Sequence, residues 1–171
     1  IHRQYIENGA KIIRTNTYAC NTFTLNYEIE DVKESIKCAC KIAREAAKGH
    51  EDIFIAGDIG PITYNHNDMQ KQVSDEYVVI AKTMIESGVD AIVFETFPDM
   101  DDIKEALKYI ERIQPRIVIP MHYRSHEFGY DVLSTNEEFI QKSSNIVYVD
   151  DYLEVHKETN GQTIVFKKPR N

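Results

Sequence analysis

The sequence predicts an α/β fold, in which a buried parallel sheet is followed by a small antiparallel β tail. Two observations support this prediction. Short, almost continuously apolar runs alternate with whole amphipathic helices as far as residue 123, which is typical of βαβ units around a parallel sheet. Near the end, Asn160-Gly161 separates "LEVHKET" from "QTIVFKK", and Asn-Gly favours a two-residue hairpin turn because both residues tolerate positive φ.

The first elements follow from periodicity and from their end signals. Residues 1–8 predict the remainder of a helix that Asn8-Gly9 ends. "AKIIRTNTY" (10–18) predicts the first strand. Apolar residues recur at helical spacing over 31–47, and Asp31 is the expected N-cap of that helix.

The same alternation continues through the middle of the chain. "DIFIAGDIGP" (52–61) predicts a strand that a Gly-Pro turn ends, and a helix over 74–87 ends at Gly88. "DAIVFETFPD" (90–99) predicts the third strand, and an amphipathic helix over 102–113 follows it.

Beyond that helix the pattern changes. "RIVIPMHY" (116–123) predicts a fourth strand, and polar residues dominate the loop after it. A short helix near 136–142 and a strand at "NIVYVD" (145–150) precede the expected hairpin.

Length and charge restrict the class of protein. The 171 residues are 42% hydrophobic, enough for one sizeable core. A net charge of −8 disfavours nucleic acid and anionic membranes as partners, because phosphates attract lysine and arginine. The chain has no apolar run of the roughly 20 residues that span a bilayer, and it begins at Ile1 without a signal peptide, as if truncated within a helix. We expect a cytoplasmic protein with a small-molecule or protein partner.

Three stretches of the first part are specific enough to suggest a family. "IIRTNTY" (12–18), "IAGDIGP" (55–61) and "GVDAIVFETFPDMDDIKEAL" (88–107) resemble the homocysteine S-methyltransferase family. The resemblance covers about residues 1–110 and implies that 1–113 is a partial (βα)₈ barrel containing the second to fourth strands. It implies methyl transfer to the thiolate of homocysteine, forming methionine, with zinc and with a methylated folate, a sulfonium or a betaine as the methyl donor.

The resemblance also identifies candidate substrate-binding residues. Barrel active sites form at the C-terminal ends of the strands. Glu95 in "FETF" stands where the family binds the amino group of homocysteine, and a carboxylate suits an ammonium. Asn16 and Thr17 end an earlier strand at the same rim, where they either contact substrate or cap the following loop. Asp58 is a weaker candidate contact, and Gly60 is expected to permit a tight turn.

The zinc ligands that the family implies are three cysteines from later strands, which are absent from this chain. Cys38 and Cys40 lie two positions apart on a predicted helix, so their side chains diverge by about 200° and cannot bind one ion together. Cys20 is not at a family ligand position. We therefore expect an incomplete and inactive fragment of a methyltransferase.

The last part of the chain suggests a second family. "PRIVIPMHYRSHEFGYDVLSTNEEFI" (115–140) is similar to the closing segment of metallo-β-lactamase-fold hydrolases. The resemblance implies that 114–171 is a separate segment, joined near 110–114, in which His122 is a metal ligand. The sequence contains no cluster of the His-x-His-x-Asp-His type to complete that site, and a single histidine at a strand end is more often structural.

Two alternatives to a methyltransferase fragment follow. One is a metal-dependent hydrolase that completes its ligand set with residues of a second chain. The other is a non-catalytic α/β fragment that self-associates, because a partial barrel leaves open strand edges.

Overall fold

The computed structural model describes residues 1–63, 69–95, 111–121, 135–150, 152–154, 158–159 and 161–167. The chain divides into two units, Ile1–Pro98 and Asp99–Asn171, which are described separately below. The two resemblances imply a different division, at residue 113. That division refers to the origin of the two segments and not to how they pack, and it stays a prediction.

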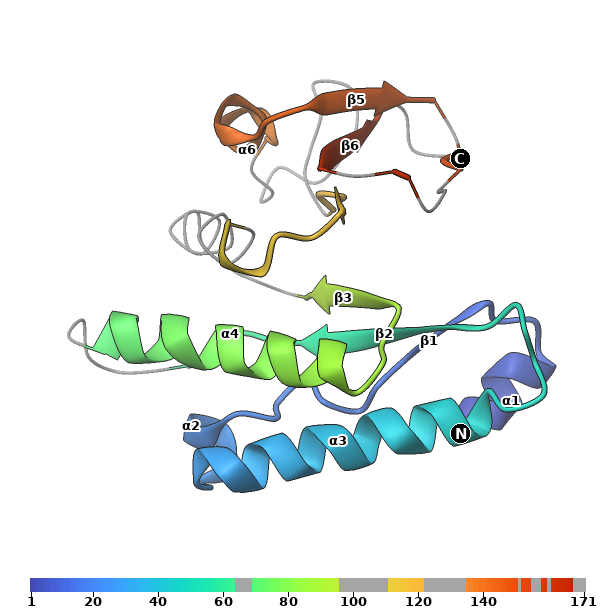
Figure 1. Ribbon diagram of the computed structural model, residues 1–171, viewed down its shortest axis with the longest axis vertical. Helices are drawn as coiled ribbons and strands as arrows, with labels where there is room; N and C mark the ends of the chain where they lie inside the picture. Colours follow the sequence, from blue (N-terminus) through green and yellow to red (C-terminus); the bar gives the residue numbers. More distant parts are fainter. Residues whose placement is uncertain are drawn as a thin grey trace. The chain divides into compact units, whose positions relative to one another are not determined.

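A three-stranded parallel sheet forms the centre of the first unit (Figure 1). Its strands are β1 (Ile12–Arg14), β2 (Phe54–Ile59) and β3 (Ala91–Phe94), in the order β1-β2-β3. Both strand pairs are parallel. The predicted α/β class and its parallel sheet are confirmed. Each strand is shorter than the apolar run that predicts it, because the strand includes only residues that pair with a neighbouring strand.

Among the described residues, the helices that connect or precede these strands are α1 (His2–Glu7), α2 (Thr22–Leu25), α3 (Ile29–Ala46) and α4 (Gln70–Glu86). The two long helices, α3 and α4, contact each other and both contact β2. They lie on the same side of the sheet (Figure 1). The left-handed backbone at Gly9 (φ +93°) and Gly88 (φ +81°) follows α1 and α4, as the end signals in the sequence predict.

The core lies between this sheet and the helices. One cluster joins Ile13 and Ile55 of the sheet to Ala43 at the end of α3. Within α3 the side chains of Val32 and Ile36 are fully buried, and their spacing places them on the face that carries Ala43. The periodicity that predicts this helix therefore corresponds to one buried face.

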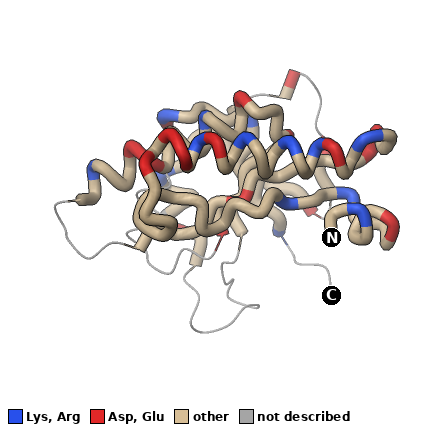
Figure 2. The backbone as a smooth tube through the Cα atoms, turned by 90° about the horizontal axis from the view of Figure 1, so that it is seen from below, with Lys and Arg blue, Asp and Glu red and all other residues tan. Residues whose placement is uncertain are grey.

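The start of α3 differs from the prediction. Its N-cap is Glu28, three residues before the predicted Asp31, and Asp31 lies in the first helical turn. An acidic residue in that turn favours the helix through its interaction with the positive end of the helix dipole. Asp31 therefore does indicate the start of a helix, but from a position inside the first turn rather than from the N-cap. Along α3, acidic and basic residues are interspersed (Figure 2), and Lys33 pairs with Glu30 at 3.0 Å.

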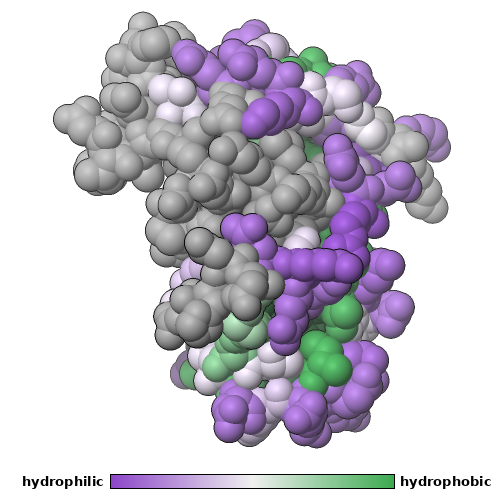
Figure 3. Space-filling model, turned by 90° about the vertical axis from the view of Figure 1, so that its left-hand side faces the viewer, coloured by the Kyte–Doolittle hydropathy of each residue, from purple (hydrophilic) through white to green (hydrophobic). Residues whose placement is uncertain are grey.

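The opposite face of the sheet carries a different set of residues. Residues paired across neighbouring strands point to the same face, so Ile12 and Phe54, which pair directly, share it. Their side chains are 63% and 56% exposed. Hydrophilic side chains cover most of the described surface in the view of Figure 3, with hydrophobic side chains in small groups.

The second unit contains another three-stranded sheet. It consists of β4 (Ile117–Val118), β5 (Ile146–Val149) and β6 (Gln162–Phe166), and the helix α6 (Glu137–Lys142) precedes β5. The strand order is β4-β6-β5, and both pairs are parallel. The short helix and the "NIVYVD" strand are confirmed.

The predicted antiparallel tail is wrong. Gly161 has the positive φ of a turn (+58°), but β6 after it pairs with β4 and β5 in parallel, and the described residues 152–154 and 158–159 are not in a strand. Asn-Gly reports a local backbone preference, whereas the partners of a strand are decided by contacts with residues distant in the sequence. β6 lies between β4 and β5, and its residue Ile164 is fully buried.

None of the described helices has the length and the apolar content that crossing a membrane requires.

Candidate functional site

Three charged side chains meet where the strands of the first sheet end. Arg14 is the last residue of β1, Asp58 lies near the end of β2, and Glu95 directly follows β3. Arg14 forms an ion pair with Glu95 and lies 3.5 Å, Nη1 to Oδ2, from Asp58. Because parallel strands direct their C-terminal ends to one edge, the fold collects these residues into a cluster, which we call the rim cluster.

The strand register explains how Arg14 reaches the two acids. Arg14 pairs with Ala56 and Ala56 pairs with Ala91, so all three residues point to the same face of the sheet. The two alanines leave room beside the long arginine side chain, which extends past them to Asp58, two residues further along β2. Arg14 cannot be identified from the sequence alone, because its contact with the two acids depends on this register.

Glu95 lies at the rim, where the sequence places it. Its backbone N–H donates to the carbonyl oxygen of Ile59 at 2.9 Å, which fixes the residue beyond the end of β3. The Glu95 side chain is 29% exposed and that of Arg14 51% exposed. The carboxylate is therefore both accessible and paired, and its predicted contact with an amino group stays a prediction.

Asp58 is the most buried member of the rim cluster. Its side chain is 8% exposed, and its Oδ1 is a buried oxygen with no hydrogen-bond partner among the described residues. Burial raises the pKa of the Asp58 carboxyl; the Arg14 guanidinium opposes this rise and the Glu95 carboxylate adds to it. A buried acceptor without a donor costs free energy, so Asp58 is a position where a ligand donor would be favourable.

Thr17 and Asn16 differ in their surroundings. Thr17 is buried and donates its hydroxyl proton to the carbonyl oxygen of Asp58 at 2.7 Å. Its oxygen also lies 2.6 Å from Oγ1 of Thr15. Asn16, between them, is exposed. Thr17 thus supports the backbone of Asp58, and direct substrate contacts by Asn16 and Thr17 stay predictions.

Gly60 has a role that its sequence position did not reveal. A Cβ atom at this residue would lie 2.6 Å from the ring and 2.7 Å from the carbonyl oxygen of Tyr18. The Gly60 N–H donates to that same carbonyl oxygen at 3.0 Å. The glycine is required by this close approach of two backbone segments, which holds the ends of β1 and β2 together.

A second polar cluster, also missed by the sequence analysis, joins α2 to α4. Glu76 is buried, and its two oxygens accept hydrogen bonds from the N–H and the hydroxyl of Thr22, each at 2.7 Å. Asn21 caps α2 by accepting from the N–H of Thr24 at 2.7 Å. The Asn-x-x-Thr cap is a visible signal, but α2 has too few residues to show periodicity.

The described residues do not fit zinc. No group of three or more His, Cys, Asp or Glu side chains in the described part of the chain can hold a metal ion. Burial raises the pKa of the Cys20 and Cys40 thiols, so both stay protonated near neutral pH. Cys38 is exposed on α3. The predicted ligand His122 lies outside the described residues.

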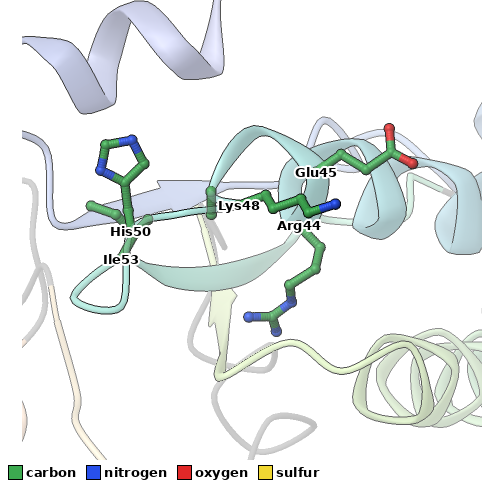
Figure 4. A pocket seen from close by; sticks show the side chains of 6 residues that line it. Arg44, Glu45, Lys48, His50 and Ile53 are labelled. Atoms are coloured by element: carbon green, nitrogen blue, oxygen red, sulfur yellow. The ribbon is translucent and has the colours of Figure 1, made fainter.

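A pocket of about 270 Å³ lies at the other edge of the sheet. It is formed around the end of α3 and the residues before β2, with Arg44, Lys48 and His50 in its lining. Figure 4 shows that the side chains of Arg44 and His50 point in opposite directions. Arg44 also forms an ion pair with Asp90. The cations do not converge on one point, so the rim cluster is the better candidate site.

Comparison with known proteins gives one family. The model of the family described as Homocysteine S-methyltransferase matches residues 1–147. The methionine synthase of Mycobacterium leprae is 32% identical over 117 residues, which are 63% of this chain and 10% of that protein. The methionine synthase of Mycobacterium tuberculosis is 31% identical over 126 residues, 68% of this chain and 10% of that protein. The chain therefore spans about 10% of the length of these relatives.

Solved structures show the same fold. The metallated form of the homocysteine methyltransferase MmuM from Escherichia coli aligns with a TM-score of 0.67 at 12% identity, over 96% of this chain and 69% of that one. Its apo form aligns with a TM-score of 0.62 at 18% identity, over 82% of this chain and 54% of that one. The predicted partial barrel-like fold is confirmed.

The extent of the family match bears on the predicted join. The match runs through residues 110–114 and ends at residue 147. It therefore includes much of the segment that resembles metallo-β-lactamase-fold hydrolases. That second resemblance, and metal binding by His122, stay predictions.

Proposed function

The chain belongs to the homocysteine S-methyltransferase family, and on this basis we propose that its rim cluster binds homocysteine for methyl transfer to sulfur. In this reaction the thiolate attacks the methyl carbon of the donor, a carbon–sulfur bond forms, and the bond from the methyl group to the nitrogen or sulfur of the donor breaks. The donor we propose is a methylated folate, with a sulfonium or betaine compound as the alternative.

The observation that supports this proposal is the pair of acids at the rim. Glu95 is accessible and Asp58 offers a buried oxygen with no described partner. An ammonium group supplies three donors and a positive charge, so it matches two neighbouring carboxylates. The α-amino group of homocysteine is such a group.

The proposal includes binding without turnover by these 171 residues alone. A thiol near neutral pH is mostly protonated and is a poor nucleophile. The described residues supply no group of ligands that could hold zinc and activate the thiol. Catalysis would therefore require ligands from a longer chain or from another subunit.

The test is isothermal titration of homocysteine into the wild type and into Glu95→Gln. The substitution keeps the shape of the side chain and removes the charge, so affinity should fall about 10-fold or more, the effect of a lost charge-assisted hydrogen bond. Glu51→Gln is the matched control, because it removes the same charge from an exposed residue before β2, at the opposite edge of the sheet. Equal affinities of Glu95→Gln and Glu51→Gln, or no binding by the wild type, would contradict the proposal.

A second candidate function is self-association. It is supported by the directly paired side chains of Ile12 and Phe54, both more than half exposed on the sheet, since exposed apolar groups at a sheet favour contact with another chain. Sedimentation velocity tests it: the wild type should sediment as a dimer or larger, and Phe54→Lys as a monomer. A monomeric wild type would contradict this candidate.

A further inference from the structure

Arg14 occupies the position between the two acids of the rim cluster. Its guanidinium is paired with Glu95 and lies 3.5 Å from Asp58. The proposed function places the ammonium of the substrate at these same acids. The arginine and the ammonium therefore compete for Glu95, and the arginine must move when the amino acid binds.

Among the described residues, the rim cluster offers exposed N–H donors as well as an acceptor without a partner. An arginine carries five N–H donors in a planar fork suited to a carboxylate, and half of the Arg14 side chain is exposed. Asp58 provides the unused acceptor, Oδ1, in the described structure. A ligand that satisfies both needs one cationic donor group and one anionic acceptor group a few bonds apart.

A zwitterionic α-amino acid has this arrangement. We propose that Arg14 determines the specificity of the site: the α-carboxylate of the ligand replaces Glu95 on the guanidinium, while its ammonium replaces the guanidinium on Glu95. This inference rests on the proposed function, because it assumes that the ammonium binds at Glu95. The exchange leaves neither side chain unpaired, since the single Arg14–Glu95 pair is replaced by two pairs, one at each end of the ligand.

An amine without a carboxylate benefits much less from this exchange. It takes Glu95 from Arg14 and gives the arginine no anion in return. When Arg14 is replaced by a neutral residue, the competitor for Glu95 and the partner of the carboxylate both disappear. The preference for an amino acid over the corresponding amine should therefore depend on Arg14.

The experiment compares two ligands and four proteins by isothermal titration. The ligands are homocysteine and 3-aminopropane-1-thiol, which is homocysteine without its carboxylate. The proteins are the wild type, Arg14→Gln, Arg14→Lys and Arg3→Gln; Arg3 is exposed on α1, so its variant controls for the loss of one positive charge. The wild type and Arg3→Gln should prefer homocysteine by about 10-fold or more.

Arg14→Gln should lose this preference, mainly because it binds the amine more tightly and homocysteine more weakly. Arg14→Lys should keep a reduced preference, because lysine retains the charge but not the planar fork. Circular dichroism checks folding, and if Arg14→Gln does not fold, the comparison of Arg14→Lys with the wild type decides the question.

An unchanged preference in the folded Arg14 variants would overturn the role of Arg14 and leave the proposed function intact, provided that Glu95→Gln still weakens homocysteine binding. Absence of homocysteine binding by the wild type would overturn both.

Discussion

Thr17 donates its hydroxyl proton to the carbonyl oxygen of Asp58, while the N–H of Asp58 donates to Oγ1 of Thr15 at 3.1 Å. A threonine has one hydroxyl proton, and Thr17 uses its proton on the carbonyl. Thr15 is therefore the donor in the 2.6 Å contact between the two hydroxyls. These three hydrogen bonds form a closed ring that joins the residues after β1 to the end of β2. The ring fixes the backbone of Asp58, one of the two acids of the rim cluster.

Thr17→Val should lower the free energy of unfolding by about 1–3 kcal/mol, because it keeps the side-chain shape but leaves the buried Asp58 carbonyl without this donor and the Thr15 hydroxyl proton without an acceptor. Urea denaturation followed by circular dichroism measures this. Thr24→Val is the control, since Thr24 is exposed, and it should change stability by less than about 0.5 kcal/mol. Equal losses in the two variants would show that the ring contributes nothing.

Gly60→Ala should destabilise the protein more than Gly57→Ala. At Gly60 the new methyl group meets the Tyr18 carbonyl oxygen at 2.7 Å, whereas at Gly57 it meets Sδ of Met84 at 2.6 Å. Backbone cannot move as freely as the end of a methionine side chain, so we expect about 2 kcal/mol or more at Gly60 and about 1 kcal/mol at Gly57. Thermal unfolding of the two variants gives the order, and the reverse order would contradict this account.

Glu76→Gln should weaken the connection between α2 and α4. The carboxylate of Glu76 accepts two hydrogen bonds from Thr22, and the amide replaces one charged acceptor with a donor. The expected loss is about 1–3 kcal/mol in the free energy of unfolding. Glu86→Gln, on the exposed side of the same helix, is the control for the change of charge. If urea denaturation gives the two variants the same stability, the contact with Thr22 is not stabilising.

Asp58→Asn should raise the free energy of unfolding at neutral pH, because an ionised carboxylate is no longer buried. The folded-state pKa of Asp58 is raised above its ordinary value of 3.8. Between these two values the folded state holds more protons than the unfolded state, so wild-type stability increases as pH falls through the raised pKa. The advantage of the asparagine variant should therefore shrink with acid and level off below 3.8.

Asp52 provides the opposite case for this pH experiment. It is exposed, and its contact with Lys11 lowers the pKa of its carboxyl. The stability that Asp52 contributes is present above its ordinary pKa and is lost as pH falls through the lowered value, so Asp52→Asn should be slightly destabilising at neutral pH only. Urea denaturation from neutral pH to below 3.8 distinguishes the two slopes. A pH-independent effect of Asp58→Asn would contradict the role of burial.

Local signals predicted much of the fold. The apolar periodicity of α3 and the glycines after α1 and α4 act within a few residues, and these elements are confirmed. The prediction of an antiparallel tail was wrong because strand pairing there depends on residues far apart in the sequence. The parallel pairing of β6 with β4 joins residues more than 40 positions apart, Val118 and Thr163, and no local preference for a turn determines such a pairing.

The candidate site shows the same division. Glu95 and Asp58 were candidates because the resemblance to the family places them at the ends of strands, where a barrel forms its site. Arg14 was not predicted, because its contact with these acids requires the register that aligns it with Ala56. The support that Thr17 gives to Asp58 was also not predicted, because a hydroxyl after a strand is compatible with either a substrate contact or a structural bond.

The order of strands in the second sheet affects when that sheet can form. β6 is the last of its strands in the chain and lies between the other two. During synthesis β4 and β5 leave the ribosome without their shared neighbour, at about 5–20 residues per second. Neither β4 nor β5 can pair fully with β6 until residue 166, the last residue of β6, has emerged. The first sheet grows in chain order instead, because each new strand pairs with the one made before it. The nascent chain thus completes β1-β2-β3 first, and a pause before residues 162–166 would prolong the exposure of β4 and β5 to chaperones and proteases.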